Sequence, residues 1–193
     1  MRRSFLVLCC LCLLGGAVAA QEVTIDDFDG YADTNAMKAN WFGSVFLESG
    51  IAVSPPNSMR PGTGSLGAGF GGSYLRTLSP ALGFRSGTLT FRYYVSDAQT
   101  GVPAGGVRFQ IQLFDGNANC SLDPEITPLS RDAWNLASLD VPTTCGATNL
   151  GSVTQLTLII RNRSSTSGVV TAYFDDFVVA GAVPVELQRF RID

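Results

Sequence analysis

Three segments of the chain alternate apolar and polar residues, which is the pattern of a β-strand with one face buried. They span residues 89–95, 107–113 and 155–162. Their apolar positions are expected to point into a core: Leu89, Phe91, Tyr93, Val95, Val107, Phe109, Ile111, Leu113, Leu156, Leu158 and Ile160. Other apolar runs are short and are separated by Gly, Pro, Ser and Asn clusters. This spacing is typical of an all-β sandwich.

The shared pattern suggests that the three segments lie in one sheet and show their polar positions on its outer face. That face would carry Arg92, Tyr94, Arg108, Gln110, Gln112 and Arg161. Amide and guanidinium groups can bond to neighbouring sugar hydroxyls, and an aromatic ring can pack on the C–H side of a sugar. The face is therefore a candidate carbohydrate-binding surface. The alternative is an ordinary solvated sheet face, because one tyrosine offers little area for stacking.

Acidic residues stand inside strand-like segments at both ends of the predicted domain. Residues 23–31 contain Asp26, Asp27 and Asp29, and residues 169–179 contain Asp175 and Asp176. A desolvated, unpaired carboxylate costs roughly several kcal/mol. We therefore expect the first and last strands to pair, to close the sandwich and to share a cation site. Alternatively, the acids are solvated at strand ends or bonded to backbone amides.

Residues 33–41 form the one segment with helical character, because Asp33 is a good N-cap and apolar residues follow it at helical spacing. Trp41, at its end, is expected to plug the core. Trp134 is expected to pack against the sheet, with a place in a ligand groove as the alternative. We expect turns at residues 114–120 and from Asp123 and Pro124 onward.

The first 20 residues read as a secretory signal peptide. A basic start is followed by a short apolar run and then by small residues ending at Ala19 and Ala20. The apolar run is too short for a membrane-spanning helix. The expected organisation is a signal peptide at 1–20, a single sandwich domain at 21–181, and a tail or added edge strand at 182–193. Export to the periplasm, the cell surface or the medium follows, without membrane insertion of the mature form.

The net charge limits the class of partner, and the number of cysteines indicates how they pair. The formal net charge is −3 and the basic residues are scattered, which argues against a nucleic-acid partner. Cys120 and Cys145 remain after signal removal, and an oxidising compartment favours a disulfide between them. Such a bond contributes roughly 3.5 kcal/mol in the chain-entropy model. The alternative is a metal-binding or reactive thiol pair.

The chain contains no histidine, which excludes Ser-His-Asp and Cys-His catalysis and the usual zinc sites. A glycosidase-type carboxylate pair is the remaining catalytic option. Asp26, Asp27, Asp175 and Asp176 could supply it, but they lie on the expected closing seam instead of in a cleft. We therefore expect the protein not to be an enzyme.

Three stretches together resemble the bacterial galactose-binding-like jelly rolls, which include carbohydrate-binding modules of secreted glycosidases. They are residues 25–31 with Trp41, residues 150–158 and residues 172–177. The resemblance covers nearly the whole mature chain. It implies two antiparallel sheets, a sugar groove on one sheet face, and a structural calcium near the paired termini. By position, it assigns Asp29 and Asp175 as calcium ligands, and oxygen ligands suit this hard cation.

The leading hypothesis is thus a secreted, non-catalytic jelly-roll sandwich that binds a poly- or oligosaccharide. The alternative is a structural or adhesive exported protein of the same fold with no sugar ligand.

Overall fold

The computed structural model describes residues 22–84, 87–181 and 183–184. The predicted signal peptide and most of the C-terminal tail lie outside these residues. The strands are β1 (Glu22–Asp26), β2 (Trp41–Phe42), β3 (Val45–Glu48), β4 (Ser58–Pro61), β5 (Ser65–Leu66), β6 (Gly71–Gly83), β7 (Gly87–Val95), β8 (Val107–Phe114), β9 (Asn119–Ile126), β10 (Trp134–Val141), β11 (Val153–Asn162), β12 (Gly168–Val169), β13 (Ala172–Ala180) and β14 (Val183–Pro184). The helices are α1 (Thr34–Lys38) and the 3-10 turn η1 (Ala104–Gly106). In this part of the chain, no helix is long and apolar enough to cross a membrane.

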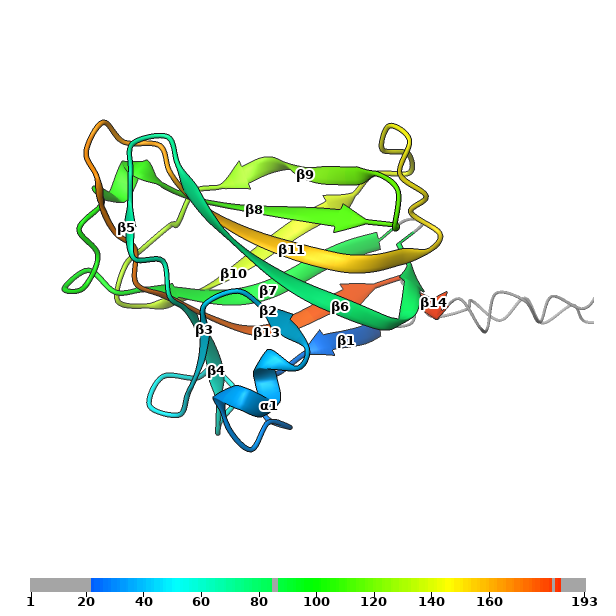
Figure 1. The fold of residues 1–193 in the computed structure, drawn as a ribbon, viewed down its shortest axis with the longest axis horizontal. Coiled ribbons are helices and arrows are strands. Elements are labelled where there is room, and N and C mark those ends of the chain that lie inside the picture. Colours follow the sequence, from blue (N-terminus) through cyan, green and yellow to red (C-terminus); the bar gives the residue numbers. More distant parts are fainter. Residues whose placement is uncertain (1–21, 85–86, 182, 185–193) are drawn as a thin grey trace, which may run out of the picture.

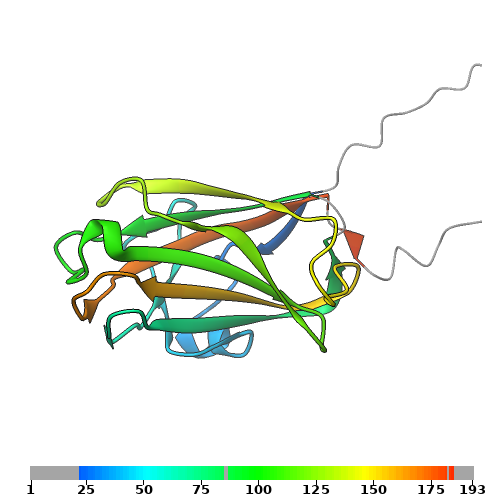
Figure 2. The ribbon, with the colours of Figure 1, turned by 90° about the horizontal axis from the view of Figure 1, so that it is seen from above.

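Two antiparallel six-stranded sheets form the body of the molecule (Figures 1 and 2). Sheet 1 has the order β10-β7-β13-β4-β3, with β1 paired to β13. Sheet 2 has the order β14-β6-β11-β8-β9, with β2 paired to β6. The short strands β5 and β12 form a separate pair. The predicted two-sheet jelly-roll sandwich is confirmed.

The expectation that the three alternating segments share one sheet is wrong. β8 and β11 are neighbours in sheet 2, but β7 lies in sheet 1 between β10 and β13. Both sheets of a sandwich have an apolar inner face and a polar outer face, so alternation shows which residues point inward without showing which sheet a strand joins. The inward positions themselves are confirmed, since all eleven are buried.

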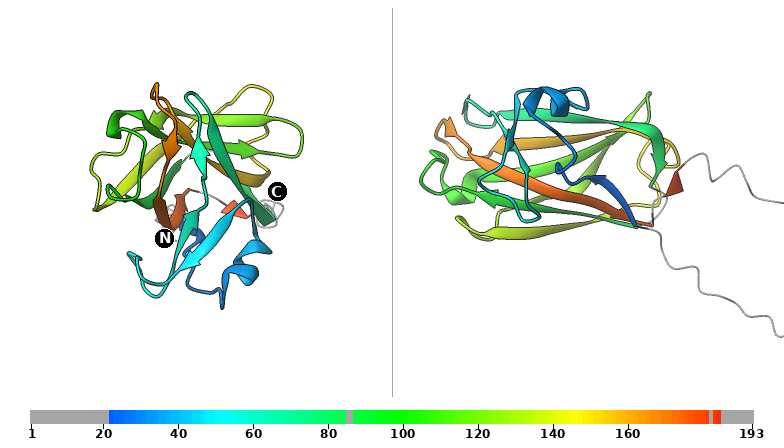
Figure 3. Two further views of the ribbon diagram at one scale, coloured as in Figure 1. Left: turned by 60° about the vertical axis from the view of Figure 1, so that its left-hand side comes forward. Right: turned by 90° about the horizontal axis from the view of Figure 1, so that it is seen from below.

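The two ends of the domain meet as predicted. β1 runs antiparallel to β13, with Glu22 opposite Ala180 and Asp26 opposite Phe177 (Figure 3, right). Farther along the chain, Val183 and Pro184 pair with Gly83 and Leu82 at the edge of sheet 2. The C-terminal segment therefore contacts both sheets in turn.

Aromatic rings fill the core beneath this seam. Phe91 and Phe177 stack with ring centroids 4.9 Å apart, and Trp41 lies 5.7 Å from Phe177. Trp41 is fully buried, so its predicted place in the core is confirmed. The helix before it is also confirmed: the Asp33 carboxylate caps α1 by accepting from the amides of Asn35 and Ala36.

Candidate functional site

The six predicted sugar-contacting residues lie on two different surfaces. Arg92 and Tyr94 are on the outer side of β7, in sheet 1. The other four lie on sheet 2, where they point outward from two neighbouring strands: Arg108, Gln110 and Gln112 from β8, and Arg161 from β11. The structure thus supports no single six-residue platform. We treat the two surfaces separately.

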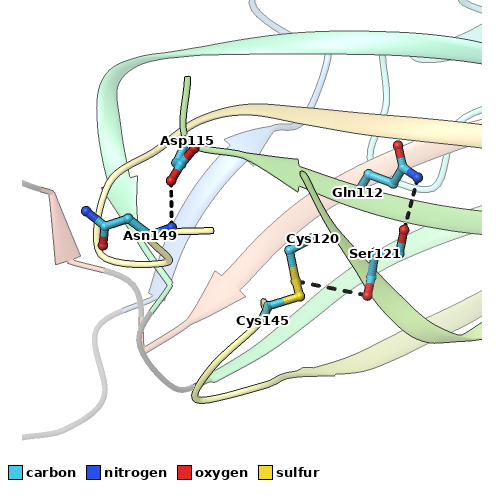
Figure 4. The surroundings of a disulfide bond; sticks show 6 residues. All are labelled: Gln112, Asp115, Cys120, Ser121, Cys145 and Asn149. Carbon is cyan, nitrogen blue, oxygen red and sulfur yellow. Dashed lines mark hydrogen bonds between the residues drawn. A yellow bond between two sulfur atoms is a disulfide. The ribbon is translucent and has the colours of Figure 1, made fainter. Parts of the chain in front are cut away.

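The β8–β11 face is the outer surface formed by Arg108, Gln110, Gln112, Thr157, Ile159 and Arg161. Its rows follow from the register, which sets Arg161 opposite Arg108, Ile159 opposite Gln110 and Thr157 opposite Gln112. The Arg161 guanidinium donates to the Gln110 Oε1 from Nη2 at 2.9 Å. Gln112 donates from Nε2 to the Ser121 hydroxyl of β9 at 3.0 Å (Figure 4). Planar polar groups therefore follow one another across three strands.

Glu125 of β9, which the sequence analysis did not single out, forms ion pairs with arginines of this face. The Glu125 Oε1 of β9 lies 3.2 Å from the Arg161 Nε and 2.5 Å from the Arg163 Nη2. The neighbouring arginines lower the pKa of Glu125, Arg163 most strongly, so it is ionised. Glu125 was missed because Asp123 and Pro124 were expected to begin a turn, whereas β9 continues through them. A proline is tolerated there because β9 is an edge strand.

The β8–β11 face also has an apolar side. Ile159 points outward but is only 6% exposed, because neighbouring side chains cover it. Across β6, Leu75 is paired with Phe42 of β2, and the Phe42 ring is 56% exposed. One end of the sheet thus offers an exposed ring and the other offers amides and guanidinium groups.

The outer side of sheet 1 carries an aromatic row made of Trp134, Tyr94 and Tyr173. The register aligns these residues on β10, β7 and β13, and each neighbouring pair of ring centroids is 5.8 Å apart. The rings of Tyr94 and Tyr173 are inclined by 74° and pack edge to face, whereas those of Tyr94 and Trp134 are tilted by 59°. The row therefore does not form a flat platform. Tyr173 is 6% exposed, and burial and Asp132 together raise the pKa of Tyr94. Trp134 does pack against the sheet, on its outer side.

The two predicted calcium ligands contact one loop, residues 51–57. The Asp29 Oδ1 accepts from the Asn57 amide at 3.1 Å, and the Asp175 Oδ2 accepts from the amides of Val53 and Ser54 at 2.9 and 3.3 Å. Asp175 is fully buried, and desolvation, followed by the charge of Asp176, raises its pKa to about 6. A buried carboxylate with a raised pKa is a reasonable place for a cation.

The rest of a calcium site would have to come from backbone and hydroxyl oxygens. Among the described residues, no three His, Cys, Asp or Glu side chains are grouped so that they could hold a metal. Both carboxylates are bonded to amides, which was the stated alternative for these acids. Calcium therefore stays a prediction.

The negative charge of Asp26, at the end of β1, is balanced by protein groups. Its carboxylate accepts from the Tyr31 hydroxyl at 2.7 Å and from the Trp41 Nε1 at 2.9 Å. The Arg76 Nε lies 2.9 Å from the Asp26 Oδ2, as an ion pair whose N–H is not aligned for a hydrogen bond. Burial and the bond to Asp26 raise the pKa of Tyr31. The predicted shared cation is therefore not needed to neutralise Asp26.

The predicted disulfide is confirmed. Cys120, at the start of β9, is bonded to Cys145 in the loop after β10, across a sequence separation of 25. Close to it, the Asp115 Oδ2 accepts from the Asn149 amide at 2.6 Å (Figure 4). Backbone amides, with that of Asn149 first, lower the pKa of Asp115. These contacts fix β9, and with it Ser121 and Glu125, against the end of the sandwich.

Three hollows of the described surface lie away from both outer faces. One of about 350 Å³ is lined by residues 143–151 near the disulfide. Two others lie at β1 and β6 and beside α1.

Comparison with solved structures places this arrangement among known folds. The family 27 carbohydrate-binding module of Caldicellulosiruptor saccharolyticus, in complex with mannohexaose, matches with a TM-score of 0.56 at 11% identity, over 83% of this chain and 97% of that one. The chain has the fold of carbohydrate-binding modules.

Two further carbohydrate-binding modules match over most of their length. The family 11 module of a Clostridium thermocellum cellulosomal cellulase has a TM-score of 0.54 at 17% identity, over 83% of this chain and 95% of that one. A xylan-binding family 22 domain of Paenibacillus barcinonensis has a TM-score of 0.52 at 14% identity, over 84% and 96%. No protein-family model and no curated protein matches the sequence. At these identities, the likeness establishes the fold.

Proposed function

We propose that the protein is an exported, non-catalytic domain that binds carbohydrate chains through the β8–β11 face. The observation that carries the proposal is the row of hydrogen-bonding groups across β11, β8 and β9, with the planar groups of Arg161, Gln110 and Gln112 followed by the Ser121 hydroxyl. Each amide offers donors and an acceptor in one plane, which suits the alternating hydroxyls of a sugar. The fold shared with the modules described above is consistent with this role.

The Gln110 and Gln112 amides use only part of their hydrogen-bonding capacity within the protein, which supports a role in ligand binding. The Gln112 Nε2 and the Gln110 Oε1 each have a protein partner, which holds the two amides in defined orientations. Gln112 is only half-buried, so its remaining amide oxygen can bond to solvent or to a ligand, whereas Gln110 is 9% exposed and offers a ligand less of its surface. Preorganised side chains lose less conformational entropy on binding.

The proposal is tested with the double variant Gln110→Ala/Gln112→Ala. A net contribution of about 1 kcal/mol from each amide predicts a loss of about tenfold or more in affinity. Isothermal titration is performed with a panel of soluble polysaccharides that includes mixed-linked β-glucan, xylan, mannan and polygalacturonate. The matched control is Gln99→Ala, which removes an exposed glutamine from the turn after β7.

Binding by the wild type that the double variant loses and Gln99→Ala retains would support the proposal. Equal affinities of the wild type and the double variant would contradict the assignment to this face. No binding to any polysaccharide at millimolar sugar would instead support a structural or adhesive role for the same fold. Circular dichroism of each variant confirms that the sheets are retained.

A further inference from the structure

Three arginines gather at one end of the β8–β11 face, where the strands approach η1. Arg108 and Arg161 are direct cross-strand partners, and Arg163 follows Arg161 on the chain. Two of them, Arg161 and Arg163, form ion pairs with one described carboxylate, that of Glu125. Asp123 belongs to the same strand, but its side chain lies outside the described set. Among the described side chains, positive charge exceeds negative charge at this end.

This arrangement conflicts with the usual cross-strand rule. Like charges directly opposite each other on one face of an antiparallel pair destabilise the sheet. The Glu125 carboxylate offsets part of this repulsion, but both of its oxygens are already taken: Oε1 by Arg161 and Arg163, and Oε2 by the Arg163 Nε at 3.1 Å. Positions that break a local rule without full compensation are often functional.

Of these three arginines, Arg108 is the one whose charge is least compensated. Its Nη1 donates to the carbonyl oxygens of Gly105 and Val107, each at 2.7 Å, which fixes the guanidinium without neutralising it. No described carboxylate lies within ion-pair distance of it. Glu125 senses its charge only at longer range, since Arg108 is the weakest of the three arginines in lowering the Glu125 pKa.

Building on the proposed function, we propose that this arginine end of the β8–β11 face binds the carboxylate of an acidic sugar, so that the preferred ligand is a uronate-containing polysaccharide. Guanidinium groups match carboxylates in geometry and form strong, charge-assisted hydrogen bonds with them. The neighbouring amides of Gln110 and Gln112 would bond to hydroxyls of the adjoining residues of the chain. The charge complementarity selects an anionic ligand over a neutral one, although the whole chain is acidic.

The test compares polygalacturonate with its methyl-esterified form, which keeps the backbone and loses the charge. The wild type is expected to bind the acid form about tenfold more tightly, and to lose this preference near 1 M salt, where the Debye length is about 3 Å. Arg108→Gln is expected to remove most of the preference, because it deletes a cation without touching the Glu125 bridges. The matched control is Arg92→Gln, the same substitution on the outer side of sheet 1.

Glu125→Gln separates this role from a purely structural one. Removing the competing carboxylate frees Arg161 and Arg163, so affinity for polygalacturonate should rise severalfold even if the melting temperature falls. A purely structural cluster predicts unchanged or weaker binding in this variant. Dextran sulfate serves as a further probe, because binding equal to that of polygalacturonate would indicate general attraction to polyanions and would contradict carboxylate recognition.

The outcomes distinguish the two proposals. Equal affinity for the acid and esterified forms, unchanged by Arg108→Gln, would overturn the acidic-sugar inference and leave carbohydrate binding in place. Failure to bind any polysaccharide, acidic or neutral, would overturn both.

Discussion

The two outer faces of the sandwich have different chemistry. The outer side of sheet 1 carries the aromatic row, whose inclined rings pack against each other. The β8–β11 face carries amides and guanidinium groups, joined by hydrogen bonds and ion pairs across β11, β8 and β9. Rings that cover one another stabilise a sheet, whereas oriented polar groups with remaining hydrogen-bonding capacity can serve a ligand. We therefore propose that the first face contributes stability and the second binds carbohydrate.

The largest expected effect comes from removing the disulfide that holds β9 beside the β8–β11 face. The variant Cys120→Ser/Cys145→Ser should lose about 3.5 kcal/mol of unfolding free energy, because a loop of this size is no longer constrained in the unfolded chain. Carbohydrate affinity should fall as well, since β9 carries Ser121, whose hydroxyl orients the Gln112 amide. Urea unfolding and titration measure the two effects.

The aromatic row provides the control for this experiment. Its near-ultraviolet circular dichroism should persist in the folded variant, because β7, β10 and β13 do not contain either cysteine. Unchanged stability and unchanged binding after removal of the disulfide would contradict its proposed role in holding the binding face.

A smaller effect is expected at the seam beside the aromatic row, where Asp175 titrates. Its folded pKa of about 6 exceeds the ordinary aspartate value, so the folded state binds the proton more tightly than the unfolded state. With chelator present, the contribution of Asp175 to unfolding free energy should therefore rise as pH falls from 7 to 5. Asp175→Asn should remove this rise, whereas Asp140→Asn, at an exposed position on β10, should keep it.

Calcium changes this expectation if it binds at Asp29 and Asp175. A cation favours the ionised carboxylate, so added calcium should raise the melting temperature at pH 7 and flatten the pH dependence. Identical melting temperatures with calcium and with chelator at pH 7 would contradict calcium binding at Asp29 and Asp175.

The smallest effect is expected from the aromatic row itself. Tyr94→Ala removes an edge-to-face contact with Tyr173 and a tilted contact with Trp134, each worth about 0.5–1.5 kcal/mol. It should lower stability while leaving carbohydrate affinity within about twofold. Tyr94→Phe keeps both ring contacts and should be nearly neutral. A loss of binding in Tyr94→Ala comparable to that in Gln110→Ala/Gln112→Ala would transfer the ligand to sheet 1.

Local patterns in the sequence predicted much of the fold. Alternation gave the inward residues of β7, β8 and β11, Asp33 marked the start of α1, and the two mature cysteines indicated the disulfide. The acids at both ends led to the pairing of β1 with β13. Each of these inferences depends on a short stretch or on a simple pairing rule.

Long-range pairing accounts for what the sequence did not reveal. The aromatic row combines residues 94, 134 and 173, and no periodicity connects positions so far apart. The same limit hid the membership of β7 in sheet 1 and the Arg76 partner of Asp26. Glu125 was overlooked for a local reason, because Pro124 suggested a turn where an edge strand continues.

A chemical-shift titration of the isotope-labelled protein with polygalacturonate and mixed-linked β-glucan oligosaccharides shows directly whether the β8–β11 face binds carbohydrate. If the ligand binds the β8–β11 face, the signals of the backbone amides of β8, β9 and β11 and of the side-chain amides of Gln110 and Gln112 should shift, while the backbone amide signals of β7 and β10 should not. Shifts confined to β7, β10 and β13 would contradict it.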